Sequence, residues 1–85
     1  MTAATTPAVA RLEERLQVLG GRILPYDHAL ITETLQRSQE GNPAYHHDIR
    51  RKGIVIANLA ATPPYSQDPK SQELLREVYE LFLKG

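Results

Sequence analysis

The sequence predicts one all-α domain, a small bundle of about four helices, and three observations lead to this prediction. A helix-capping residue stands directly before proline at Thr6-Pro7, Asn42-Pro43 and Asp68-Pro69, a pairing typical of helix starts. Between these points apolar residues recur every three or four positions, which is the spacing of one helix face. Eighty-five residues leave room for a single hydrophobic core.

The first helix is expected over residues 7–19, after a flexible N-terminus over residues 1–6. Residues 7–85 form the single domain. Apolar side chains occupy one side of this helix and charged ones the other, as on an ordinary surface helix. Gly20-Gly21 then supplies the left-handed conformation that commonly ends a helix. The apolar positions are Val9, Leu12, Leu16 and Leu19.

The second helix is expected over residues 28–40, with Asp27 as its N-cap and Gly41 just beyond its end. Its apolar stripe lies opposite charged and amide side chains, so this helix also covers one side of the core. The stripe consists of Leu30, Ile31, Thr34 and Leu35.

The third helix, expected over residues 43–61, is predicted to be the central one. From Ile54 to Ala57 the chain is apolar all round the helix, and such a stretch is usually buried on every side. Gly53 costs about 1 kcal/mol relative to alanine inside a helix, so a short strand over residues 53–57 is the alternative. A strand needs a partner, and no second β-branched run exists in the sequence, so we expect a helix.

The fourth helix is expected over residues 69–84 and has the widest apolar face. Its apolar side chains span an arc of about 200°, whereas a helix on a monomer's core needs only somewhat more than about 100°. The excess predicts contact with another copy of the chain, with another protein or with an apolar ligand. The expected partner-binding residues are Leu75, Tyr79, Phe82 and Leu83.

Composition excludes several classes of site. Ten basic and ten acidic residues give a net charge of zero, so no global field attracts nucleic acid or acidic lipid. The absence of cysteine excludes disulfides, thiolate metal sites and a cysteine nucleophile. No apolar run approaches the roughly 20 residues of a membrane-spanning helix, and no signal-peptide pattern is visible. We therefore expect a cytoplasmic protein that does not bind membranes.

The segment Tyr45-His46-His47 followed by Arg50 is the candidate ligand site. Tyrosine or imidazole can bind haem iron while an arginine pairs with a propionate, so an oligomeric haem-, ligand- or metal-binding protein is one alternative function. A metal ion alone fits poorly, because each imidazole lies one turn before an arginine, Arg50 or Arg51, that would repel it. We assign no metal ligand and no cofactor.

The cations Arg50, Arg51 and Lys52 are the candidate nucleic-acid contacts, and a small nucleic-acid-binding regulator is a second alternative. These side chains fan around the helix rather than line one face, so the pattern does not favour this function. No nucleophile elbow or phosphate loop is present, and we do not expect an enzyme. The leading hypothesis is a helical accessory protein that self-associates or docks to a protein partner through its C-terminal helix.

Overall fold

The structure is a computed structural model that describes residues 7–84. It confirms the all-α prediction, because these residues form four α-helices and no strand. The helices are α1 (Pro7–Leu19), α2 (Pro25–Glu40), α3 (His46–Ala60) and α4 (Pro69–Lys84). Short 3-10 turns lie in the connections, at Gly20–Arg22, Pro43–Tyr45 and Tyr65–Gln67. The flexible N-terminus expected over residues 1–6 lies outside the described residues.

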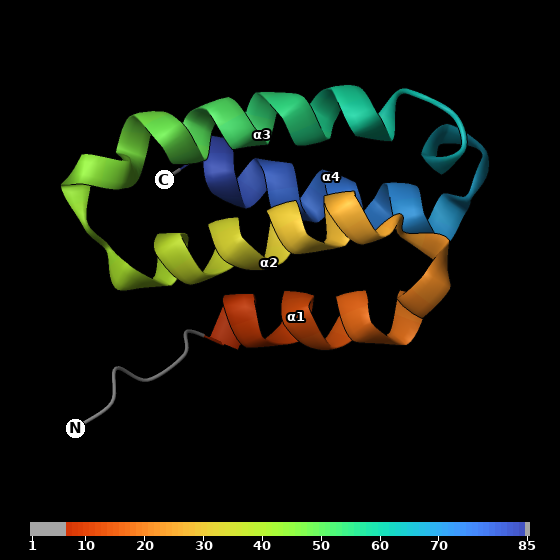
Figure 1. The fold of residues 1–85 in the computed structure, drawn as a ribbon, viewed down its shortest axis with the longest axis horizontal. Coiled ribbons are helices and arrows are strands. Elements are labelled where there is room, and N and C mark those ends of the chain that lie inside the picture. Colours follow the sequence, from red (N-terminus) through yellow and green to blue (C-terminus); the bar gives the residue numbers. More distant parts are fainter. Residues whose placement is uncertain (1–6, 85) are drawn as a thin grey trace.

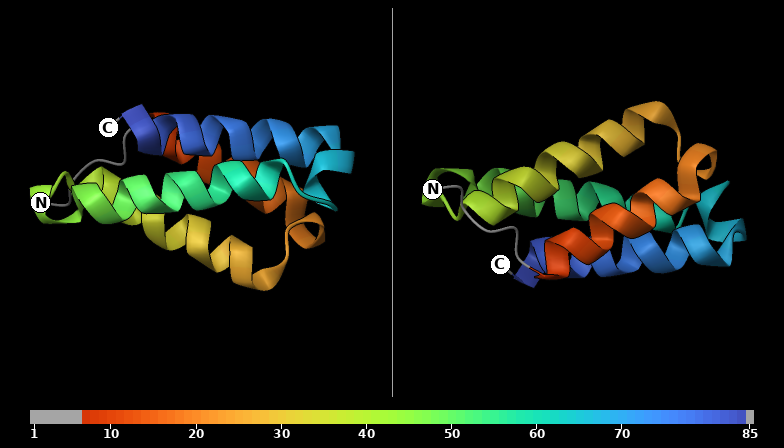
Figure 2. Two further views of the ribbon diagram at one scale, coloured as in Figure 1. Left: turned by 90° about the horizontal axis from the view of Figure 1, so that it is seen from above. Right: turned by 90° about the horizontal axis from the view of Figure 1, so that it is seen from below.

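The four helices alternate in direction and form a ring (Figure 1). The main contacts join α1 to α2, α2 to α3, α3 to α4 and α4 back to α1, and the α3–α4 contact is the most extensive. Views from above and from below show the same order of helices (Figure 2). Short connections produce antiparallel neighbours of this kind. Each helix makes its main contacts with two others, so one side of α3 stays open to solvent.

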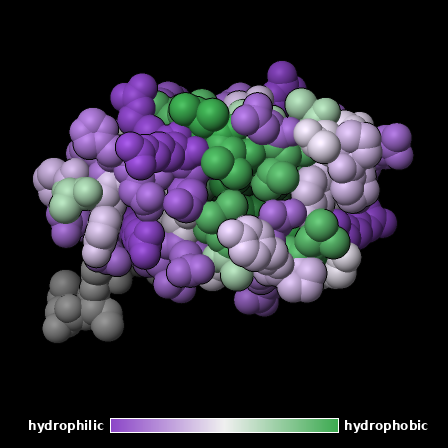
Figure 3. Space-filling model, turned by 45° about the horizontal axis from the view of Figure 1, so that its top comes forward, coloured by the Kyte–Doolittle hydropathy of each residue, from purple (hydrophilic) through white to green (hydrophobic). Residues whose placement is uncertain are grey.

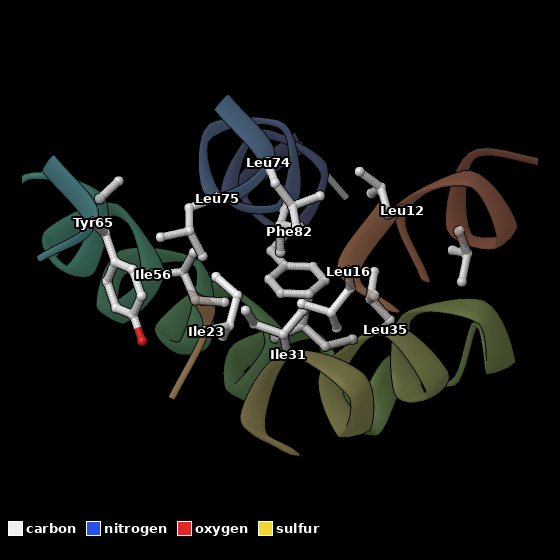
Figure 4. Close-up of a cluster of buried hydrophobic side chains, with 14 residues drawn as sticks. Leu12, Leu16, Ile23, Ile31, Leu35, Ile56, Tyr65, Leu74, Leu75 and Phe82 are labelled. Carbon is white, nitrogen blue, oxygen red and sulfur yellow. The ribbon is translucent and has the colours of Figure 1, made fainter. Parts of the chain in front are cut away.

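The core lies along the axis of this ring and receives side chains from every helix (Figure 4). Burying a large aliphatic or aromatic side chain contributes roughly 1.5–3 kcal/mol to folding. Leu16 of α1, Ile31 of α2, Ile56 of α3 and Phe82 of α4 are each at most 1% exposed. The spacing of apolar residues therefore identified core side chains on every helix, although not every apolar residue that it assigned to the core is buried.

The start of α2 differs from the prediction. The helix begins at Pro25, because proline loses no hydrogen bond at the first helical position and its fixed φ suits a helix. Asp27 therefore lies within the first turn and is not the N-cap. The end of α2 is as predicted, since Gly41 adopts the left-handed conformation with φ of 69°.

The α3 segment also begins later than expected. The Asn42 side chain accepts a hydrogen bond from the Ala44 amide at 3.0 Å, but this cap starts a 3-10 turn, and α3 begins at His46. Gly53 lies inside α3, so the alternative strand does not form. A Cβ at this position would lie 3.0 Å from the Phe82 Cβ and 3.1 Å from the Leu83 side chain. Glycine thus allows α4 to approach α3 closely.

Tyr65 ties the loop between α3 and α4 to the start of α2. Its side chain is 2% exposed, its hydroxyl donates to Asp27 Oδ2 at 2.5 Å, and the same oxygen accepts from the Leu24 amide at 3.0 Å. Burial, together with the hydrogen bond to Asp27, raises the pKa of Tyr65 to about 12. One buried hydroxyl therefore fixes the position of two connections.

Candidate functional site: the outer face of α3

The four side chains predicted to bind a partner on α4 divide into two groups. Leu75 and Phe82 are fully buried in the core, so they cannot contact a partner of the folded chain. Tyr79 and Leu83 are half-buried and lie at the edge of α4 next to α3. The wide apolar arc of α4 is thus largely covered by its own chain, since α1 and α3 pack on either side of it.

The larger exposed apolar surface lies on α3. Ile54 is 56% exposed and Val55 is 42% exposed, whereas Ile56 is fully buried. The prediction that this stretch is buried on every side is therefore wrong. Successive helical residues point about 100° apart, so four consecutive apolar residues cannot all face the core of a ring in which α3 has a free outer side. The exposed apolar surface that the sequence predicted on α4 therefore lies on α3.

A hydrophobic patch is visible in the middle of the molecular face that α3 and α2 share (Figure 3). On α3, Ile54 and Val55 are the exposed large hydrophobic residues, and the half-buried Leu59 follows one turn after Val55. On the other flank of α3, a shallow groove of about 610 Å³ runs along the seam with α4. Its lining includes Ala57 and Ala60 of α3 and the C-cap residue Ala61, together with Gln72, Arg76 and Tyr79 of α4.

The predicted ligand-binding residues are not brought together into an enclosed site. Tyr45 is half-buried, and the Arg37 guanidinium lies 5.4 Å from the centre of its ring. His46, His47 and Arg50 are exposed and point in different directions around α3. The cavity that His46 lines has a volume of about 60 Å³, far below the roughly 300 Å³ or more of a cofactor pocket. Within residues 7–84, no group of three or more histidine and carboxylate side chains could hold a metal ion.

The predicted nucleic-acid contacts also separate. Lys52 is half-buried and bonds Asp48 at 3.2 Å, and Arg37 reaches the same carboxylate from α2 at 3.0 Å. The hydrogen bond from Lys52, supported by Arg37, lowers the pKa of Asp48 below its ordinary value. Arg50 and Arg51 are exposed and form no ion pair with another described residue. The three cations therefore do not make one continuous binding surface.

The edge of α2 next to α3 carries a stripe of residues that the sequence reasoning did not identify. We call it the α2 stripe, and its members recur every three or four positions. Arg37 places the stripe beside α3, because it bonds Asp48 there. Glu33 and Glu40 are exposed and form no ion pair within the described residues, and Tyr26 is 81% exposed. The members are Tyr26, Leu30, Glu33, Arg37 and Glu40.

The regular spacing of the α2 stripe was a signal that could have revealed it. The sequence reasoning instead assigned Leu30 to the core stripe, together with Ile31, although Leu30 is only half-buried. Adjacent helical residues point about 100° apart, and here Ile31 points into the core while Leu30 lies at the edge of the core face. Assigning Leu30 to the edge would have grouped it with Glu33 and with Arg37.

Comparison with known proteins identifies no relative. No family model matches the sequence, and searches of curated proteins and of solved structures found no match either. Within residues 7–84, no helix combines the length and the apolar character that crossing a bilayer requires. We therefore infer the function from the geometry and chemistry of the outer face of α3.

Proposed function

We propose that this chain is a helical interaction protein that binds a protein surface through the outer face of α3. The observation that carries this proposal is the exposure of Ile54 and Val55, two adjacent β-branched residues in the middle of a well-packed helix. Burying such side chains against a partner contributes roughly 25 cal/mol for each Å² of apolar surface removed from water. A location in the cytoplasm stays part of the proposal.

This proposal moves the binding surface from α4 to α3 and retains part of the original one. Tyr79 and Leu83 are half-buried at the seam, so they can extend the apolar surface of α3 at one edge. Leu75 and Phe82 do not contribute, because the core contains them. Arg51 forms no ion pair with another described residue, lies one turn before Val55 and supplies a polar contact at the margin.

Site-specific photo-crosslinking in the source cells tests the proposal. A photoreactive residue replaces Ile54 or Val55 and, as a control, Val18, which is 81% exposed on α1. We expect positions 54 and 55 to give the same protein adduct, identified by mass spectrometry, and position 18 to give none. Excess unlabelled protein should suppress the adduct.

Competition by variants provides the matched control. An excess of the Val18→Asp chain should suppress the adduct as well as the unmodified chain does, because α1 is not part of the proposed surface. An excess of the Val55→Asp chain should not, because a carboxylate would then be buried against the partner. Equal labelling from position 18, or equal competition by both variants, would refute the proposed function.

A further inference from the structure

We infer that the partner of the α3 face is a second copy of this chain, bound in a symmetric pair in which α2 of each copy lies on α3 of the other. This inference rests on the proposed function and adds the identity of the partner. It follows from two complementary stripes on one face of the molecule, which are close together where Arg37 bonds Asp48 and diverge toward the start of α2 (Figure 2). One is the α2 stripe, and the other is the adjoining edge of α3.

The edge of α3 beside α2 has its own regular composition. Asp48, which bonds Arg37 of α2, marks this edge. Arg51 follows three residues later, Val55 four residues after that, and Leu59 one further turn along. We call these four residues the α3 stripe. It presents an unpaired cation and then apolar side chains, while the α2 stripe presents unpaired carboxylates and the exposed ring of Tyr26.

The bond between Arg37 and Asp48 sets the levels of the two antiparallel stripes. Both helices rise about 1.5 Å per residue, so a step back along α2 matches a step forward along α3 approximately, because α2 is inclined to α3 (Figure 2). Glu33 then lies at about the level of Arg51 to Lys52, Leu30 at about the level of Val55, and Tyr26 at about the level of Leu59. Acid thus stands level with base, and apolar residues stand level with apolar residues.

A two-fold axis parallel to the helices, above the seam between α2 and α3, uses this pattern directly. Rotation about that axis preserves the level of each residue and exchanges the two helices. Glu33 of one copy therefore meets Arg51 of the second copy, and Leu30 with Tyr26 meets Val55 with Leu59. The same set of contacts occurs twice, as in any isologous dimer.

Three observations favour a second copy over another partner. The face contains unpaired charges of both signs, so it is complementary to itself. The net charge of the chain is zero, so two copies do not repel each other at long range. The partly exposed apolar residues lie at one end of each stripe, beyond the charges and at similar levels, where a symmetric contact would bury them.

Charge reversal with the purified full-length chain tests this arrangement. Arg51→Glu and Glu33→Arg should each weaken dimerisation at least about tenfold in sedimentation equilibrium, because each change places like charges together at two symmetric contacts. Arg50→Glu is the matched control. Arg50 is equally exposed and unpaired but lies on the α4 side of α3, so we expect a change of less than about threefold.

Mixing the two weakened variants gives the decisive result. In a heterodimer of the Arg51→Glu and Glu33→Arg chains, both contacts again join opposite charges, so dimer formation should recover to within about threefold of the unmodified chain. Energy transfer between differently labelled variants measures this recovery. Circular dichroism checks that each variant retains its helices.

Three outcomes would overturn the inference. These are an unmodified chain that stays monomeric at about 1 mM, equal effects of the changes at positions 50 and 51, and a mixture that does not recover. If crosslinking from Val55 then identified a different protein, the proposed function would stand without the second copy. If crosslinking from Val55 and Val18 were alike, the proposed function itself would fail.

Discussion

Helices α3 and α4 use their apolar residues in opposite ways. In α4 these residues form a broad arc centred on the core, and α1 and α3 cover the two edges of that arc. In α3 the apolar residues include a consecutive run, which is distributed all round the helix and leaves Ile54 and Val55 exposed. Whether an apolar arc faces the core therefore indicates a binding surface better than the width of the arc does.

The largest difference between the two helices should appear when α4 loses a core side chain. We expect Phe82→Ala to lower the free energy of unfolding by about 3–5 kcal/mol, because the removed ring leaves a cavity among fully buried neighbours. Urea denaturation followed by circular dichroism measures the change. A loss below about 1 kcal/mol would show that α4 is not packed as described.

A side chain at Gly53 should disturb the contact between the two helices. We expect Gly53→Val to destabilise the fold by about 1–3 kcal/mol, since its Cβ would approach the Phe82 Cβ to 3.0 Å and the branched methyl groups would increase the overlap. Gly21→Ala is the control, because no atom lies within 4 Å of a Cβ added there. Thermal unfolding of both variants checks the prediction, and an unchanged midpoint for Gly53→Val would contradict it.

The buried hydroxyl of Tyr65 should contribute an intermediate amount. We expect Tyr65→Phe to cost about 1–3 kcal/mol, because the Asp27 carboxylate and the Leu24 amide lose their shared partner. The pKa of Tyr65 is raised from 10.0 to about 12, so the folded state holds this proton more tightly than the unfolded state does.

This raised pKa predicts a specific dependence of stability on pH. The contribution is fully present below about pH 10 and is lost as the pH rises from 10 toward 12. Measuring urea unfolding of the unmodified chain and of Tyr65→Phe across this range isolates the effect. The stability difference between the two chains should shrink with rising pH, and a difference that stays constant would contradict the prediction.

The ion pairs between α2 and α3 should matter less. Asp48→Asn removes carboxylate contacts with Arg37 and Lys52, and we expect a loss of at most about 1 kcal/mol, because all three side chains are partly exposed to water. The pKa of Asp48 is lowered, so its contribution is present above the ordinary value of 3.8 and is lost as the pH falls below it. Urea denaturation of the unmodified chain and of Asp48→Asn at pH 7 and at about pH 2 measures the effect. The difference in free energy of unfolding between the two chains should be smaller at the lower pH.

The smallest effect on folding should come from the exposed pair of α3. We expect Val55→Ser to change the free energy of unfolding of the isolated subunit by no more than about 0.5 kcal/mol, because this side chain is 42% exposed and surface changes are usually this small. Urea unfolding at low protein concentration measures the effect. A loss above about 2 kcal/mol would mean that Val55 serves the core instead of a partner.

The fold was predictable where local signals agreed. Proline dipeptides and apolar spacing correctly marked Pro7 as the start of the first helix and Pro69 as the start of the last. The start of α2 was not predictable from Asp27, because its carboxylate bonds Tyr65, which lies 38 positions away in the sequence. Local capping rules cannot anticipate a partner at that separation.

The candidate site was predictable only in part. The apolar run from Ile54 to Ala57 was visible in the sequence, but its exposure depends on how many helices surround α3, which is a property of the whole fold. The separation of Lys52 from Arg50 and Arg51 depends likewise on the bond that Arg37 of α2 makes with Asp48. Contacts between helices determine which side chains stay available.

Concentration-dependent amide chemical shifts test the central claim most directly. As the ¹⁵N-labelled chain is concentrated from about 20 μM to about 1 mM, we expect the largest shifts along the α2 and α3 stripes, around Glu33 and Val55. Amides of Leu75 and Phe82, the two buried α4 positions first expected to bind a partner, should shift little. Shifts concentrated in α4, or none at all, would contradict self-association through the outer face of α3.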